Sequence, residues 1–270
     1  MIRPEVLAHR IDGAGETVVL LNGGMMSIPS WDAIAAPLAA GYGVLRCDFR
    51  GQLRSPGTAH PDLTGHVADL VNLLDDLGIE SAHAIGTSFG AEVGLLLAAS
   101  HPERVASLVA ATATDVATPP LRSGGDGLGR EFRKAADGGD RSRLLALMQA
   151  IFYSPGYVAS HRGELAERAA QVALLPGWWF AGAADLLASL ENLDLRRYLG
   201  SIACPVLVVE AAEDQVMPPG CARALVSAIP GARLEVVEGS GHALVAERPG
   251  EFANICLMFL EEIKDLGGPS

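Results

Sequence analysis

Short apolar runs alternate with amphipathic stretches along the first part of the chain. Aliphatic and β-branched runs predict strands at residues 17–21, 43–47, 81–85 and 105–110. Between these runs, apolar residues recur at helical spacing, which predicts helices over residues 31–40, 66–77 and 89–100. Strands and helices that alternate in this way favour an α/β fold, in which helices cover both faces of a mostly parallel central sheet.

The alternation stops after Ala113 and resumes near residue 206. Residues 118–143 are rich in Gly, Pro and charged side chains and predict a loop. Helical spacing follows over residues 144–151, 164–174 and 183–190, then strands are predicted at 206–210 and 234–238 and helices at 221–229 and 251–266. We therefore expect an α/β core, residues 1–116 and 199–270, interrupted by a helical cap insertion, residues 117–198.

The composition of the chain argues against two kinds of function, nucleic-acid binding and metal binding through cysteines. The chain has 20 Lys and Arg residues against 32 Asp and Glu residues, a formal net charge of −12, and 49% apolar residues. This acidic chain has no basic stripe with interleaved aromatic residues, which argues against nucleic-acid binding. Its four cysteines are far apart and form no CxxC pair, so we expect reduced thiols and no metal site.

The sequence also predicts where the protein is found. The first residues, MIRPEVLAHR, lack the apolar segment of a signal peptide, and no apolar run approaches the roughly 18 residues that span a bilayer. We therefore expect a soluble, cytoplasmic protein that binds neither nucleic acid nor membrane. The sequence leaves the oligomeric state open, a homodimer included.

The most specific motif is Gly86-Thr87-Ser88-Phe89-Gly90, between a predicted strand and a predicted helix. A nucleophilic serine must stand on a tight turn of this kind, and the flanking glycines let the neighbouring backbones approach. The alternative is a serine that caps an ordinary turn between strand and helix.

A serine nucleophile needs a histidine base and a carboxylate that orients the histidine. His242 follows the last predicted strand, and Asp214 follows the penultimate one. The order Ser88, Asp214, His242 is the chain order of an α/β-hydrolase triad. Glu213 and Asp115 are the competing acids. The remaining histidines are interpreted as surface or helix-cap residues: His9, His60, His66, His83, His101 and His161.

Acyl transfer also needs hydrogen-bond donors for the developing oxyanion. One is expected to be the backbone N–H of Phe89, which follows the nucleophile. The other is expected from Gly24 or Met25, in the Gly-rich turn after the strand at residues 17–21.

These motifs resemble the α/β-hydrolase superfamily, and specifically its small-molecule esterases, enol-lactonases and non-haem haloperoxidases. LLNGG at residues 20–24 resembles the family's LLHGG-type oxyanion segment, CDFRG at 47–51 its DxRG turn, and GSGHALVAERPGEF at 239–252 its histidine loop. The resemblance implies a cofactor-free hydrolase with a helical cap over the site. Two positions depart from the family pattern: Asn22 stands where the family usually has His, and Gln52-Leu53-Arg54-Ser55 replaces the usual Gly-His-Gly-x-Ser continuation.

We expect a serine hydrolase that cleaves small carboxylic esters or lactones through an acyl-enzyme intermediate. Met26, Trp178 and Trp179 are the candidate pocket residues, although aromatic residues in the cap equally suit packing of the cap against the core. The alternatives are a lyase or C–C bond hydrolase that uses the same triad for proton transfer, a perhydrolase, and a ligand-binding module without catalysis.

Overall fold

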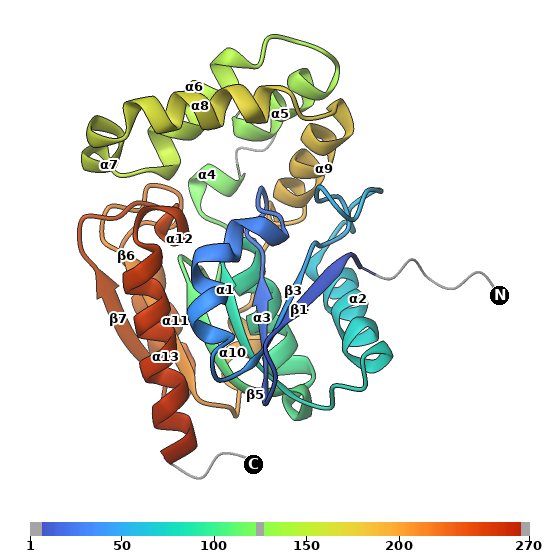
Figure 1. The fold of residues 1–270 in the computed structure, drawn as a ribbon, viewed down its shortest axis with the longest axis vertical. Helices are drawn as coiled ribbons and strands as arrows, with labels where there is room; N and C mark the ends of the chain where they lie inside the picture. Colours follow the sequence, from blue (N-terminus) through green and yellow to red (C-terminus); the bar gives the residue numbers. More distant parts are fainter. Residues whose placement is uncertain (1–6, 123–126, 266–270) are drawn as a thin grey trace, which may run out of the picture.

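A seven-stranded sheet forms the centre of the computed structural model, which describes residues 7–122 and 127–265 (Figure 1). The strand order is β1-β3-β2-β4-β5-β6-β7, and all neighbours are parallel except β1 and β3. The strands are β1 (His9–Asp12), β2 (Thr17–Leu21), β3 (Gly43–Cys47), β4 (Ala82–Thr87), β5 (Val105–Ala111), β6 (Val206–Ala211) and β7 (Arg233–Val237). The predicted α/β architecture with a mostly parallel sheet is confirmed.

Strand β1 is absent from the sequence prediction. It is short, mostly exposed and polar, and it pairs antiparallel with β3 at the edge of the sheet. An exposed edge strand of this kind carries no apolar run, so the hydrophobic pattern does not reveal it. The strands that were predicted differ from the observed ones by at most two residues at their ends.

Helices cover both faces of the sheet (Figure 1). On one face, α1 (Asp32–Leu38) packs against α13 (Pro249–Asp265). The helices on the other face are α2 (Leu63–Asp76), α3 (Phe89–Ser100), α10 (Arg196–Leu199) and α11 (Cys221–Ala228). Short helical turns lie in three of the connections: η1 (Ile28–Trp31), η2 (Pro102–Arg104) and α12 (Leu244–Glu247). Because both faces are covered, the central strands are almost entirely buried and mostly apolar.

Helix α2 shows how local chemistry sets the ends of these elements. The Asp62 carboxylate accepts hydrogen bonds from the N–H groups of Thr64 and Gly65, so the helix begins at Leu63 instead of residue 66. After the helix, Gly78 adopts a φ of 67°, a conformation that glycine takes without steric cost.

The connection from β5 to β6 contains six further helices within the described residues, and they lie beyond the carboxyl ends of the strands (Figure 1). They are α4 (Pro119–Arg122), α5 (Leu128–Ala136), α6 (Ser142–Phe152), α7 (Pro155–Ser160), α8 (Arg162–Ala173) and α9 (Gly177–Ala188). Helices α5 and α9 pack closely together, with Phe132, Trp179 and Phe180 in a separate small core. The exact division into core and cap at residues 117 and 198 stays a prediction.

The prediction of a loop over residues 118–143 is wrong, because α4 and α5 lie there. Helix α5 buries Phe132 and Ala135 and leaves Arg133 and Lys134 largely exposed. Its few apolar residues were obscured by the glycines and charges around them, which dominate the composition of the segment.

Within the described part of the chain, no helix combines the length and the apolar character that crossing a bilayer requires. All four cysteines are free thiols, as predicted, and burial raises the pKa of Cys47 to about 12.

Candidate active site

Ser88 lies on a strained turn between β4 and α3. Its φ of 50° falls in the left-handed region, which side chains other than glycine rarely adopt. A Cβ at Gly86 would lie 2.6 Å from the Gly90 carbonyl oxygen, and a Cβ at Gly90 would lie 2.2 Å from the Leu21 carbonyl oxygen. The two glycines of the motif are therefore required for α3 to approach β2 and β4 so closely.

Residues 88, 214 and 242 form one chain of hydrogen bonds. The Ser88 hydroxyl lies 3.0 Å from His242 Nε2, and His242 Nδ1 lies 2.8 Å from Asp214 Oδ2. The other Asp214 oxygen accepts from the N–H groups of Val216 and Met217, both at 2.8 Å. Because the buried carboxylate accepts the Nδ1–H proton, Nε2 is left as the acceptor for the Ser88 hydroxyl.

The loop after β6 distinguishes Asp214 from its competitors. Glu213 is exposed, and the Asp214 side chain is 1% exposed beneath the imidazole. Asp115 follows β5 and is buried, but among the acidic side chains of the described residues only Asp214 hydrogen-bonds to His242. The side chain of Ser88 makes no capping hydrogen bond to α3, and its hydroxyl bonds to His242 instead.

Two histidines that were interpreted as surface residues are buried. His66 is fully buried against the rings of Phe49 and Phe89, and His83 lies 2.8 Å from the Ser107 hydroxyl within the sheet. The interpretation fails because position alone, in a helix or strand, does not say which face is covered.

A second buried carboxyl lies near the triad. Glu92, one turn into α3, accepts a hydrogen bond from the N–H of Thr114 at 3.0 Å. Complete burial, together with the nearby negative charge of Asp214, raises the pKa of Glu92 to about 8. Glu92 is therefore largely neutral near pH 7.

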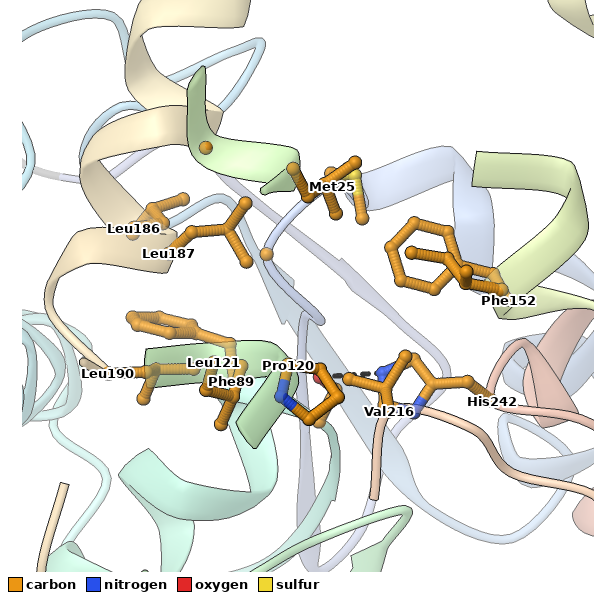
Figure 2. A pocket seen from close by; sticks show the side chains of 15 residues that line it. Met25, Phe89, Pro120, Leu121, Phe152, Leu186, Leu187, Leu190, Val216 and His242 are labelled. Carbon is orange, nitrogen blue, oxygen red and sulfur yellow. Dashed lines mark hydrogen bonds between the residues drawn. The ribbon is translucent and has the colours of Figure 1, made fainter. Parts of the chain in front are cut away.

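A cavity opens above Ser88, and we call it the Ser88 cavity (Figure 2). The predicted oxyanion residues Gly24, Met25 and Phe89 all line it, beside Ser88 and His242. The N–H groups of these three residues donate to no acceptor among the described residues. They are thus available to a ligand oxygen in the cavity.

Apolar side chains from the cap complete the walls of the Ser88 cavity. Figure 2 shows Leu186, Leu187 and Leu190 facing Met25 and Phe152 across the space above His242. The further lining residues are Pro120, Leu121, Leu128, Gly129, Ile151 and Val216. The centroid of the Phe152 ring also lies 5.6 Å from that of the His242 ring, so the cap packs directly against His242.

The structure places the predicted pocket residues Met26, Trp178 and Trp179 outside the described lining of the Ser88 cavity, and that prediction is corrected. Trp179 is buried in the cap between Phe132 and Phe180, with ring centroids 6.2 and 4.9 Å away, and Trp178 is 43% exposed. The Met26 sulfur instead accepts from the Gly23 N–H. Trp179 therefore serves packing within the cap, the alternative that the sequence left open.

The wall that sequence reasoning missed is the end of α9. Leu186 and Leu187 lie about two turns beyond the tryptophans, and Leu190 lies two residues after the helix ends at Ala188. Their helical spacing was a usable signal, since residues four apart share one helix face.

Comparisons with known proteins agree with the observed fold. The family profile described as alpha/beta hydrolase fold matches residues 16–249. A protein of Caulobacter vibrioides with the name "Putative carbamate hydrolase RutD" is 31% identical over 256 residues, which cover 92% of this chain and 91% of that protein.

Two solved structures are similar over almost the whole chain. MGS-M2, an alpha/beta hydrolase enzyme from a Medee basin deep-sea metagenome library, has a TM-score of 0.88 at 28% identity, with 94% of both chains covered. The enol-lactonase from Burkholderia xenovorans LB400 has a TM-score of 0.83 at 25% identity, with 94% of this chain and 96% of that chain covered.

Proposed function

Because the chain belongs to the α/β-hydrolase fold family, as its motifs predicted, we propose that this hydrolase cleaves small carboxylic esters or lactones through an acyl-enzyme intermediate. The observation that carries the proposal is the chain of hydrogen bonds from Asp214 through His242 to Ser88, at the floor of an apolar cavity.

In the proposed reaction, the Ser88 oxygen attacks the acyl carbon while His242 Nε2 removes the hydroxyl proton. Asp214 holds the imidazole in the required tautomer and stabilises the imidazolium that forms. The N–H groups of Phe89 and of Gly24 or Met25 donate to the oxyanion. His242 then protonates the leaving alkoxide, and water releases the acid from Ser88.

The walls of the cavity favour an uncharged substrate. Ser88 and His242 carry the polar side chains among its described lining residues, and none of those residues is Lys or Arg. Burying a carboxylate against leucines without a cation is costly. We therefore propose that the cavity accepts a short apolar acyl or alcohol group. The name of the Caulobacter relative makes a carbamate the second candidate substrate.

Replacing the nucleophile tests the mechanism. Ser88→Ala is expected to lower kcat for p-nitrophenyl butyrate on the order of 10⁴–10⁶-fold with the fold intact, because the acyl-enzyme no longer forms. Ser227→Ala, at an exposed position on α11, is the matched control and should retain full activity. Turnover by Ser88→Ala at the wild-type rate would remove Ser88 from the mechanism.

A substrate panel tests the reaction class. Simple esters and lactones should give burst acylation, whereas carbamates, vinylogous diketones and cyanohydrins should be turned over more slowly. A fluorophosphonate probe should label wild-type protein and leave Ser88→Ala unlabelled, because only an activated serine reacts. Absence of labelling in the wild type would favour a ligand-binding module, and faster cleavage of diketones would favour a C–C bond hydrolase.

A further inference from the structure

The two positions that depart from the family pattern contact each other beneath the oxyanion segment. Asn22 begins the turn after β2, and Gln52 lies in the loop after β3, yet Asn22 Nδ2 donates to Gln52 Oε1 at 2.8 Å. Both side chains are buried, with exposed fractions of 0% and 1%. Buried amides must find partners for both their donor and acceptor atoms, so their orientation is constrained.

The hydrogen bonds around this pair fix which way each amide points. Gln52 Oε1 also accepts from the Phe49 N–H at 2.8 Å, and Asn22 Oδ1 accepts from Trp31 Nε1–H at 2.7 Å. Asn22 Nδ2 has a second acceptor in Asp48 Oδ1 at 3.1 Å. If either amide were rotated by 180°, its NH₂ group would face another N–H donor, that of Trp31 for Asn22 or that of Phe49 for Gln52. The Gln52 NH₂ group is thereby directed toward the turn after β2.

There the Gln52 NH₂ group holds the carbonyls of the oxyanion segment. Gln52 Nε2 donates to the Gly23 carbonyl oxygen at 2.8 Å and lies 3.4 Å from that of Gly24. In a trans peptide, the C=O of one residue and the N–H of the next point in opposite directions. A Gly23 carbonyl held against Gln52 therefore turns the Gly24 N–H away from Gln52, and Gly24 lines the Ser88 cavity.

Consecutive glycines make such a restraint necessary. Gly23 and Gly24 have no side chains to pack, so the peptide between them can rotate at little steric cost. A donor that rotates stabilises the transition state less than one already aimed at the oxyanion. The Met26 N–H also donates to the Gly23 carbonyl, at 3.0 Å, which closes the turn from its other end.

We propose that Gln52 is a positioning residue that holds the Gly23 carbonyl so that the Gly24 N–H faces the oxyanion, with Asn22 in turn holding Gln52. The proposal rests on the proposed function, because the oxyanion exists only if Ser88 attacks an acyl carbon.

Two substitutions at residue 52 test this role. Gln52→Met removes the donor while keeping an unbranched side chain, and Gln52→Glu keeps the acceptor but places an oxygen against the Gly23 carbonyl. Both are expected to lower kcat for p-nitrophenyl butyrate on the order of 10²-fold with KM within about twofold, because the transition state loses an aligned donor. Inhibition by a trifluoromethyl ketone, whose adduct carries an oxyanion, should weaken by the same factor as kcat.

A pH profile separates positioning from a general loss of structure. At low pH the introduced carboxyl of Gln52→Glu is protonated and can donate to the Gly23 carbonyl again. The ratio of its kcat to the wild-type kcat should therefore rise as pH falls, whereas the ratio for Gln52→Met should stay constant. Ser30→Ala is the control: it removes the hydrogen bond from the Ser27 N–H in the same segment without touching either glycine carbonyl.

The outcomes distinguish this proposal from the function on which it rests. Wild-type protein without turnover would overturn both, whereas active wild type with folded Gln52→Met and Gln52→Glu at wild-type kcat would overturn the role of Gln52 alone. If neither variant folds, Asn22→Ser tests the same network: a loss of kcat of about tenfold at unchanged KM supports the proposal, and an unchanged kcat overturns it.

Discussion

The buried His66 makes the stability of this protein depend on pH. His66 is fully buried in α2, where the Phe49, Phe89 and His60 rings meet it edge-on with centroids 5.0–5.9 Å away. Burial, with a smaller contribution from His60, lowers the pKa of His66 from 6.5 to about 4, although Asp69 opposes the shift. The apolar face of α2 contained the signal for this burial, since His66 precedes Leu70 and Leu73 by four and seven residues.

The unfolded chain binds a proton at residue 66 more readily than the folded protein does. The stability that His66 contributes as a neutral ring is therefore complete above about pH 6.5 and is lost as pH falls toward about 4, on the order of 3 kcal/mol in all. Urea unfolding at several pH values measures this effect. Between about pH 6.5 and 4, the free energy of unfolding should decrease less steeply for His66→Phe than for wild type. His9→Gln, at an exposed strand position, should keep the wild-type slope, and identical slopes for all three proteins would contradict the prediction.

At the scale of elements, the turn between β4 and α3 depends on close backbone contact. Most elements were predicted because their apolar spacing reports burial directly, and α3 has the bounds that the sequence predicted. The short helices α4, α7 and α12 were missed because each has too few residues for a period to be visible. Their positions depend on what they pack against.

Two glycines of α3 provide a matched test of this contact. A Cβ at Gly90 would meet backbone oxygens of Leu21 and Asn22 at 2.2 and 2.6 Å, whereas a Cβ at Gly94 would meet only the ends of two leucine side chains, at 3.0 and 3.3 Å. Gly90→Ala should therefore destabilise the protein by more than about 3 kcal/mol or prevent folding, and Gly94→Ala by about 1 kcal/mol. Thermal denaturation measures both, and equal melting temperatures would contradict the prediction.

At the scale of the whole molecule, a buried carboxylate joins the cap to the histidine loop. Glu247 Oε1 accepts from the N–H groups of Ser154 and Gly241, both at 3.0 Å, and Oε2 accepts from the Ser154 hydroxyl at 2.6 Å. The Ala243 N–H also donates to the Phe152 carbonyl at 2.7 Å. The loop that carries His242 is thus fixed against the segment between α6 and α7.

Removing this carboxylate should affect stability and activity together. Glu247→Ala leaves the donors of Ser154 and Gly241 without their acceptor, which costs on the order of 3 kcal/mol and lets the His242 loop move. We expect a melting temperature lowered by several degrees and a lower kcat, whereas Glu247→Gln, which keeps the shape and an acceptor, should lose much less. The idea fails if Glu247→Ala melts and turns over like the wild type.

The sequence by itself determined the alternating elements, the turn that carries Ser88 and the chain order of Ser88, Asp214 and His242. These follow from local constraints: apolar spacing reports which face is buried, and a strained turn requires glycine neighbours. Only the tertiary structure decided that α9 leucines instead of tryptophans wall the cavity, that His66 is buried, and that Asn22 and Gln52 meet under the oxyanion segment. Those contacts join residues far apart in the chain, and no local pattern specifies which distant side chain fills a given space.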